Sequence, residues 1–396
     1  MRAVEITHIA KRNTMAKKTA TIVDIGSSRI TTIIGERGIN GSYKILGKGD
    51  VSYDGFSNGK FFSPADVKNV IAMSLSNAEI TSGTKVTEVF IGVPGEFSSV
   101  YVADVSIDFG KKRKVKEADM FALFKKGAKK HPTNSIINNT LVYAVLDDGK
   151  RVIDPVGKVT QKLEAKVCYS LAENNFLDFI SKIMVELSIR HVVFISGPLA
   201  ESNYLLDPQL RDRYAILVDT GYITTSVMLA QGDGLLFLNS FSMGGGHITG
   251  DLYQVLKTNF AQAESLKRKI VLGWQTGENE TYDLMGKEYI STYSAKTTNE
   301  IAEARIETIC KYIQKCLDRC EYEFPDYLPI YLTGGGLNYI KGIKDFMGRK
   351  LGRKVELVAP KLAQTERPDY SSEISLLDLA ISQSENNYNI IYTSRW

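Results

Sequence analysis

The sequence IVDIGSSRITTII, residues 22–34, is an apolar β-branched run, an Asp, a glycine turn with small hydroxylated neighbours, and a second β-branched run. The pattern returns as ILVDTGYITTSV at residues 216–227. Each copy predicts a β-hairpin whose tip is formed by residues that tolerate unusual backbone angles. A glycine-rich tip exposes backbone N–H groups that can bind an anion, and the Asp supplies a carboxylate oxygen suited to hydrated Mg²⁺. Two such hairpins on opposite sides of one site indicate that the chain grips phosphate groups.

A third segment, IYLTGGGL at residues 330–337, predicts a strand that runs into a glycine triplet. A helical pattern follows at residues 340–351. Glycines at a strand end let a flat ring or a sugar approach the backbone closely. Each hairpin alone is equally well explained by an ordinary β-turn. The order of hairpin, hairpin and strand with glycine triplet is similar to that of the actin-like ATPases, and it favours a nucleotide site.

Composition bounds the remaining possibilities. The chain has 396 residues, which is enough for two or more domains with sizeable cores. Its hydrophobic content of 43% and charged content of 24% are typical of a soluble globular protein. A net charge of +4 is too small to indicate nucleic acid, so we expect no nucleic-acid partner. No apolar run approaches the roughly 18 residues of a membrane span, and four cysteines predict thiols rather than a disulfide framework.

From Ala20 to about Ala380, the chain resembles the FtsA family of bacterial actin-like cell-division proteins. Besides the hairpins and the triplet, the resemblance is carried by short motifs: YDGFSNG at 53–59, NAE at 77–79, DPVG at 154–157, LEA at 163–165, AESLK at 263–267, PDY at 368–370 and LLD at 376–378. Residues 99–181 interrupt the duplicated pattern, with a basic helical stretch expected around 111–130. A module inserted at this position distinguishes the family from actin, heat-shock chaperones and sugar kinases, which carry their insertions elsewhere.

The expected fold is α/β, an actin-like ATPase fold of two lobes. Each lobe has a mixed sheet flanked by helices, and the first lobe carries the inserted small α+β subdomain. The predicted parts are a disordered extension (1–18), subdomain 1A (19–98 and 182–212), subdomain 1C (99–181), subdomain 2A (213–245 and 325–380), subdomain 2B (246–324) and a C-terminal tail (381–396).

The resemblance implies ATP and Mg²⁺ as ligands, with Asp24 and Asp219 facing the metal. It assigns contacts with the phosphates to Gly26, Ser27, Ser28, Arg29, Asp219, Gly221, Thr224 and Thr225. It assigns contacts with the ribose and adenine to Glu264, Lys267, Gly334, Gly335 and Gly336. Without the resemblance, Glu264 and Lys267 are better explained as an ion pair on the surface of a helix.

Several positions depart from the family pattern. Tyr222 and Ile223 replace two glycines of the second phosphate loop, and Ser226 replaces a later Asp. A Tyr at this turn restricts the loop and is expected to crowd a phosphate. Arg29 stands where the family often has Lys, which keeps the charge but changes its geometry. Since the sequence offers no residue to orient an attacking water, we expect ATP binding with slow or absent hydrolysis and assign no catalytic residue.

The resemblance also implies partners and a location. Such a protein polymerises at the inner face of the cytoplasmic membrane, tethers the FtsZ ring at the division site, and recruits other divisome components through subdomain 1C. The acidic C-terminal tail of FtsZ would bind subdomain 2B, where Arg305 matches a basic position and Lys296 is a neighbour. Residues 388–396 suit either a short, weak membrane anchor or a frayed or docked end.

Two other functions remain open at this point. An enzyme of the same superfamily, either a small-molecule kinase or a chaperone-like ATPase, would share the nucleotide fold. A kinase needs a further carboxylate as general base, and the sequence indicates none once Asp24 and Asp219 are assigned to the metal. A pilus-assembly-type actin-like protein would also share the fold, but it would bind a different cytoplasmic tail.

Overall fold

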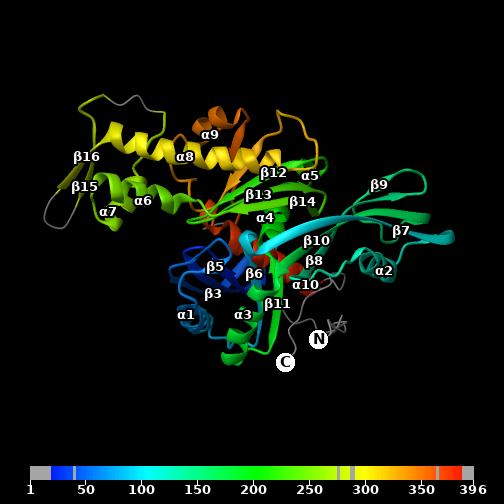
Figure 1. Cartoon of the computed structure of the whole chain (residues 1–396). Coiled ribbons are helices and arrows are strands. Elements are labelled where there is room, and N and C mark those ends of the chain that lie inside the picture. Colours follow the sequence, from blue (N-terminus) through cyan, green and yellow to red (C-terminus); the bar gives the residue numbers. More distant parts are fainter. Residues whose placement is uncertain (1–18, 39–41, 274–276, 286–289, 363–364, 386–396) are drawn as a thin grey trace.

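The computed structural model describes residues 19–38, 42–273, 277–285, 290–362 and 365–385. The extension predicted at 1–18 and residues 386–396 of the predicted tail lie outside these ranges. Two lobes are stacked on each other, and an inserted sheet projects from one side of them (Figure 1). The expected α/β fold with two mixed sheets is confirmed. The exact subdomain boundaries stay a prediction.

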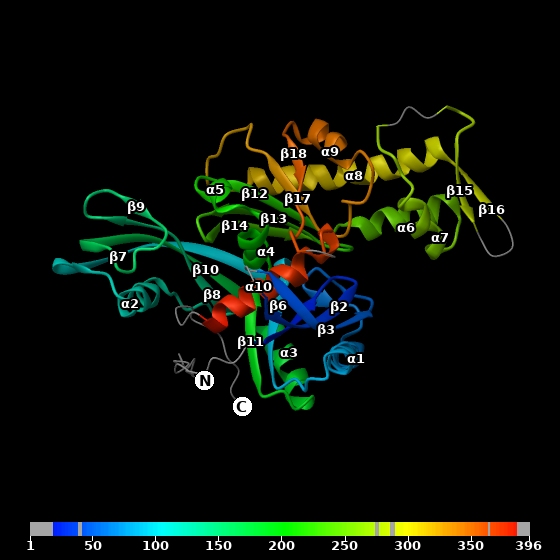
Figure 2. The same cartoon turned by 180° about the vertical axis from the view of Figure 1, so that it is seen from behind.

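Lobe I contains a five-stranded sheet. Its strands, in spatial order, are β11 (His191–Ser196), β6 (Glu88–Val93), β1 (Thr19–Ile25), β2 (Arg29–Arg37) and β3 (Tyr43–Ser52). The β1–β2 and β2–β3 pairs are antiparallel, whereas β6 is parallel to both β1 and β11. Helices α1 (Pro64–Ser82) and α3 (Asn174–Glu186) cover one face, and α4 (Gly197–Leu205) and α10 (Ser371–Glu385) cover the other (Figure 2).

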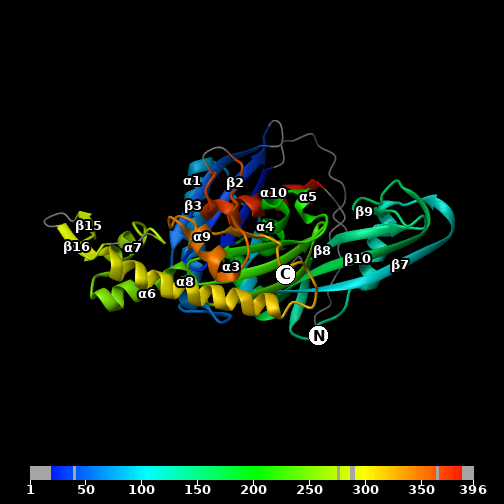
Figure 3. The same ribbon diagram turned by 90° about the horizontal axis from the view of Figure 1, so that it is seen from above.

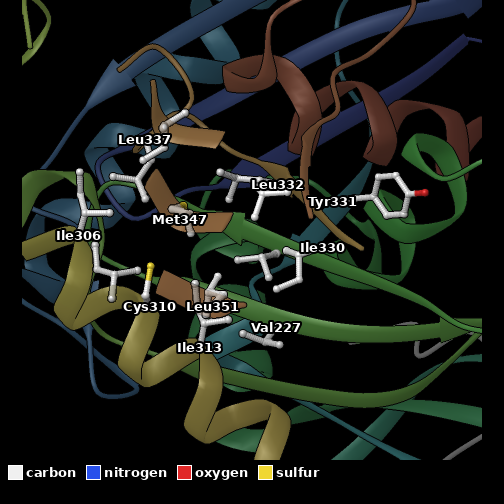
Figure 4. Close-up of a cluster of buried hydrophobic side chains, with 14 of the residues drawn as sticks. Val227, Ile306, Cys310, Ile313, Ile330, Tyr331, Leu332, Leu337, Met347 and Leu351 are labelled. Carbon is white, nitrogen blue, oxygen red and sulfur yellow. The ribbon is translucent and has the colours of Figure 1, made fainter. Parts of the chain in front are cut away.

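Lobe II repeats this strand order. Its strands are β14 (Gly234–Phe241), β13 (Thr225–Gln231), β12 (Ala215–Thr220), β17 (Ile330–Thr333) and β18 (Val355–Leu357). Helices α8 (Ala295–Asp318) and α9 (Ile343–Leu351) cover one face. Ile306, Cys310 and Ile313 of α8 face the sheet, and Met347 of α9 completes this dry core (Figure 4). The two hairpins therefore occupy equivalent positions in two copies of one topology.

The insertion is a four-stranded sheet with one helix. Its elements are β7 (Ser98–Lys114), β10 (Val159–Glu173), β8 (Asn134–Leu146), β9 (Arg151–Val152) and α2 (Glu117–Gly127). The helix expected around 111–130 is shorter than predicted, because Arg113 still pairs with Thr160 in the sheet. Gly232 of lobe II packs its backbone on the insertion: its φ is +55°, and an added Cβ would lie 1.8 Å from the carbonyl oxygen of Val142.

The end of lobe II opposite the insertion is formed by α6 (Gly245–Leu256), α7 (Phe260–Lys267) and the hairpin of β15 (Thr281–Met285) and β16 (Ile290–Ser294) (Figure 3). The remaining elements are short: β4 (Phe56–Ser57), β5 (Lys60–Phe61), η2 (Gly95–Phe97), α5 (Pro208–Arg211) and η3 (Pro368–Tyr370). Helix α10 continues to Glu385 with Ile381 buried, so the tail predicted from 381 begins inside this helix. None of the helices in the described ranges has the length and apolar character needed to cross a membrane.

Candidate functional site

The two hairpin tips have the same backbone geometry. In the first, the N–H of Gly26 donates to the carbonyl of Arg29 over 3.0 Å. In the second, the N–H of Gly221 donates to the carbonyl of Thr224 over 2.8 Å. Each tip therefore closes over four residues, and the Asp lies two positions before the glycine in both strands. The sequence repeat is a structural repeat, with one copy in each lobe.

The tips meet between the lobes. The backbone N–H of Ile223 donates to the Ser27 hydroxyl oxygen over 3.0 Å. The carbonyl of Ser28 accepts the N–H of Tyr53, which fixes the first tip from its other side. Thr225 is fully buried, and its hydroxyl donates to the carbonyl of Met243. The structure thus brings the two predicted phosphate loops together, while it uses Thr225 to fix the loop that precedes α6.

Three carboxyl groups gather behind the tips: Glu201 is buried, whereas Asp24 and Asp219 are half-buried. Burial and the neighbouring Asp24 raise the pKa of Asp219 to about 7. Burial is also the main cause that raises the pKa of Asp24, which accepts a hydrogen bond from Ser372 over 3.0 Å. Glu201 of α4 is only 4% exposed, and burial together with Asp219 and Asp24 raises its pKa well above the ordinary value. Because each charge penalises the others, a cation placed here would be strongly favoured.

This donor set fits a hydrated Mg²⁺ better than a directly bound metal. Among the described residues, no three Asp, Glu, His or Cys side chains converge closely enough to hold a metal ion themselves. Mg²⁺ usually keeps several waters and takes only one or two carboxylates beside phosphate oxygens. Asp24 and Asp219 are compatible with such contacts through water.

Arg29 points away from the space between the tips. Its Nη2 donates to the carbonyl of Asp369 over 2.8 Å and to Oε1 of Glu373 over 3.0 Å. Lys48 holds the other oxygen of Glu373 over 2.6 Å. Arg29 therefore ties the first hairpin to α10, and a contact with phosphate would require it to change its rotamer.

The glycine triplet packs directly on the second hairpin. Gly334 has a φ of +89°, and an added Cβ would lie 2.1 Å from Oδ1 of Asp219. The N–H of Gly336 donates to the carbonyl of Thr220 over 2.7 Å, while Gly335 packs on Asp369. Only glycine permits so close a backbone approach. The triplet is therefore needed for packing at this site, independently of any ligand.

The residues assigned to adenosine form a cluster of their own. Nζ of Lys267 lies 2.7 Å from the Glu264 carboxylate and donates to the carbonyl of Gly245 over 3.1 Å. The Thr249 hydroxyl donates to the Glu264 carboxylate over 2.7 Å. Above them lies the ring of Tyr222, 5.2 Å from Nζ of Lys267. In this conformation the nucleoside end of the site does not fit a nucleoside, because Tyr222 stands among the residues that would hold one.

The position of Ser226 has no room for a carboxylate. Its hydroxyl lies 2.9 Å from that of Ser240, and an added Cβ on Gly95 of lobe I would lie 2.3 Å from it. Close packing between the lobes at Ser226 therefore leaves no space for the Asp that the family pattern has at this position.

The two residues assigned to partner binding lie apart. Arg305 makes a bidentate ion pair with Asp251, at 2.6 and 2.8 Å. Lys296 is exposed near the start of α8. Nine residues are about two and a half helical turns, so the two side chains leave α8 on opposite faces. Within the described residues no ion pair is found for Lys296, whereas a short peptide would have to compete with Asp251 for Arg305.

Sequence reasoning missed Glu201. The segment GPLAES at 197–202 indicates a helix start, and its single acid sits among residues that are otherwise apolar or small. A charged residue on the buried side of a short helix is unusual unless it has a task. That mismatch is the signal that could have identified it.

The model of the family described as "Cell division protein FtsA" matches residues 216–375. The FtsA of Staphylococcus epidermidis is 24% identical over 372 residues, which cover 92% of this chain and 79% of that protein. The FtsA of Bacillus subtilis is 20% identical and covers 90% of this chain and 82% of its own. The resemblance to the FtsA family is confirmed.

Solved structures support the fold. A chain of the PilM–PilN type IV pilus biogenesis complex matches with a TM-score of 0.60 at 15% identity, covering 92% of this chain and 99% of its own. MreB5 of Spiroplasma citri, bound to AMPPNP, matches with a TM-score of 0.57 at 9% identity, covering 94% and 98%. At these identities the likeness establishes the actin-like fold alone.

Proposed function

We propose that the protein is an actin-like cell-division scaffold, which joins copies of itself into a filament at the inner face of the cell membrane and binds the C-terminal tail of FtsZ. The observation that carries this is the similarity to FtsA proteins over about nine-tenths of the chain, inserted sheet included. The insertion projects from lobe I on the side opposite α6 and α7 (Figure 1), which leaves its outer part accessible to other divisome components.

ATP with Mg²⁺ is the proposed ligand of the two hairpin tips where the lobes meet. Gly26 and Ser27 from one lobe and Gly221 and Thr224 from the other would surround the phosphates. Asp24 and Asp219 would face the waters of the metal, which supplies the positive charge that this group of acids needs. Glu201 would position a water, but Ser226 lacks the carboxylate of the family pattern, so hydrolysis is still expected to be slow or absent. The ligand then acts by favouring closure of the two lobes.

The tether is tested by cosedimentation with FtsZ polymers. We expect the protein to pellet with intact FtsZ and to stay in the supernatant with FtsZ that lacks its C-terminal tail. Equal pelleting with both forms, or with neither, would contradict the tether. A kinase or chaperone function would instead give saturable ATP consumption stimulated by a sugar or a peptide.

The binding surface is tested with substitutions on α8. Lys296→Glu should weaken binding of a fluorescent FtsZ-tail peptide at least fivefold, because it puts a negative charge against an acidic peptide. Lys315→Glu makes the same change on the same helix, beside Tyr312, and should leave binding unaltered. Unchanged affinity in Lys296→Glu would remove this residue from the proposed surface.

Membrane attachment is proposed to be weak and to use the last residues of the chain. Because α10 reaches Glu385, the informative truncation ends there. The intact chain should pellet with anionic liposomes and the truncated chain should not. Equal recovery of both would rule out the tail as an anchor.

A further inference from the structure

We propose that Tyr222 is a built-in occupant of the nucleoside end of the proposed site, so that a nucleotide binds tightly only when this ring moves out. The inference rests on the proposed nucleotide site and concerns its regulation. It follows from where the ring lies, what surrounds it, and how the backbone accommodates it.

The ring lies flat on the start of α6. A Cβ added to Gly246 would be 2.6 Å from the nearest ring carbon of Tyr222 and 2.8 Å from two others. The N–H of Gly246 also donates to the carbonyl of Tyr222 over 2.7 Å. Gly246 therefore presents bare backbone to the tyrosine, which is the approach that glycines commonly provide for a flat ligand ring.

Two of the other neighbours, Lys267 and Glu264, are residues that the resemblance assigns to adenosine. The ammonium group of Lys267 lies 5.2 Å from the ring centre of Tyr222 and 5.6 Å from that of Tyr339, within cation–π range of both. The Tyr222 hydroxyl is within hydrogen-bond reach of Thr249, whose own hydroxyl binds Glu264. The hydroxyl and the ring of Tyr222 thus lie against residues that would contact the ribose and the base of a nucleoside.

The backbone holds Tyr222 without strain. Among the described residues, the non-glycine residues with positive φ are Asn58, Ser188 and Lys257, and Tyr222 is not one of them. The tip therefore accepts a side chain at this position in an ordinary conformation. Backbone strain at Tyr222 therefore does not favour moving the ring out, and the incoming ligand has to displace it.

Among the described residues, the contacts found for the Tyr222 ring and hydroxyl are with Gly246, Lys267 and Thr249, and none of these belongs to the phosphate end. The contact between the tips uses the backbone of Ile223 and the hydroxyl of Ser27. A phosphate chain without a nucleoside would consequently bind without moving Tyr222. This separates the two ends of the site experimentally.

Calorimetric titration of four proteins with Mg-ATP and with magnesium tripolyphosphate tests the proposal. The proteins are the wild type, Tyr222→Gly, Tyr222→Ala and Tyr222→Phe. Removing the ring in the Gly and Ala variants should raise the affinity for ATP at least tenfold, since the competing occupant is gone. Tyr222→Phe keeps the ring and should bind ATP as weakly as the wild type. Affinity for tripolyphosphate should be the same in all four.

The other outcomes overturn the proposal in distinguishable ways. Equal, tight ATP binding by the wild type and the Gly variant would refute the role of Tyr222 and leave the nucleotide site intact. Absence of binding by every protein to both ligands would refute the nucleotide site itself. Thermal melting of each variant without ligand shows whether it is folded, and having both Gly and Ala variants guards against misfolding of one.

Discussion

The N–H of Ile223, in the tip of the second hairpin, donates a hydrogen bond to the hydroxyl of Ser27, in the tip of the first, over 3.0 Å. The contact joins residues from different lobes, at the place where the proposed phosphate site lies. Because the donor is a backbone amide, breaking this contact can be detected by hydrogen exchange at Ile223.

Ser27→Ala should loosen the contact between the tips. The hydroxyl acceptor is lost, which costs about 1 kcal/mol for a typical hydrogen bond. The amide hydrogen of Ile223 should then exchange with solvent at least several-fold faster. Ser28→Ala is the matched control, since within the described ranges no hydrogen bond is found for that hydroxyl. Unchanged exchange at Ile223 in Ser27→Ala would contradict the contact.

Gly232→Ala should destabilise the junction of lobe II with the insertion. The new Cβ would meet the Val142 carbonyl at 1.8 Å, and the residue has a φ of +55°. We expect a loss of about 2 kcal/mol or more in the free energy of unfolding, measured by urea denaturation. Gly149→Ala has the same backbone strain, at φ +79°, but nothing within 4 Å of the added carbon. An equal loss in both variants would show that the contact with Val142 is unimportant.

Glu201→Gln should stabilise the protein in the absence of ligand. At pH 8 the charged form of Glu201 is disfavoured by burial and by Asp219 and Asp24. A neutral side chain of the same shape removes that penalty, so the melting temperature should rise, by the equivalent of about 1 kcal/mol or more. The exposed Glu300 provides the control, Glu300→Gln, which should have no effect. A lower melting temperature in Glu201→Gln would mean that its charge is compensated within the protein.

Glu373 should make stability depend on pH. Burial raises its pKa from 4.5 to about 7 in the folded protein, despite the ion pairs with Lys48 and Arg29. The folded state then binds the proton more tightly than the unfolded state, so this contribution is complete below pH 4.5 and is lost as the pH rises through about 7. The difference amounts to about 3 kcal/mol at most.

The measurement is urea denaturation between pH 4.5 and pH 8 for the wild type and Glu373→Gln. The wild type should lose stability relative to the variant as the pH rises. Glu366→Gln, at an exposed position, should follow the wild type. Parallel curves for the wild type and Glu373→Gln would disprove the prediction.

Local patterns made much of the fold predictable from the sequence. The β-branched runs on either side of each glycine turn determine the strands, and the Asp positions then follow from the hairpin register. The bounds of α1 follow from local residues, since Pro64 suits the first turn and Gly83 ends the helix in a left-handed conformation. The glycine triplet likewise marks a strand end.

Long-range contacts were not predictable in the same way. The position of the Tyr222 ring depends on Gly246 of α6 and Lys267 of α7. The sequence of the turn alone does not include these neighbours, and it suggested instead that the ring crowds a phosphate. The ion pairs of Arg29 and Arg305 depend on partners far along the chain. The place of Glu201 in the site could not be predicted, because it depends on α4 bringing this residue near Asp24 and Asp219.

The central claim is that hairpins from two lobes hold one ligand. Titration of Mg-ATP into Tyr222→Gly, alone and combined with Asp24→Ala or with Asp219→Ala, tests it most directly, with the exposed Asp212→Ala as control. In the Tyr222→Gly background, Asp24→Ala and Asp219→Ala should each weaken ATP binding at least tenfold, although the two aspartates lie in different lobes. Asp212→Ala should leave the affinity unchanged. Full affinity after loss of either aspartate would contradict a shared site.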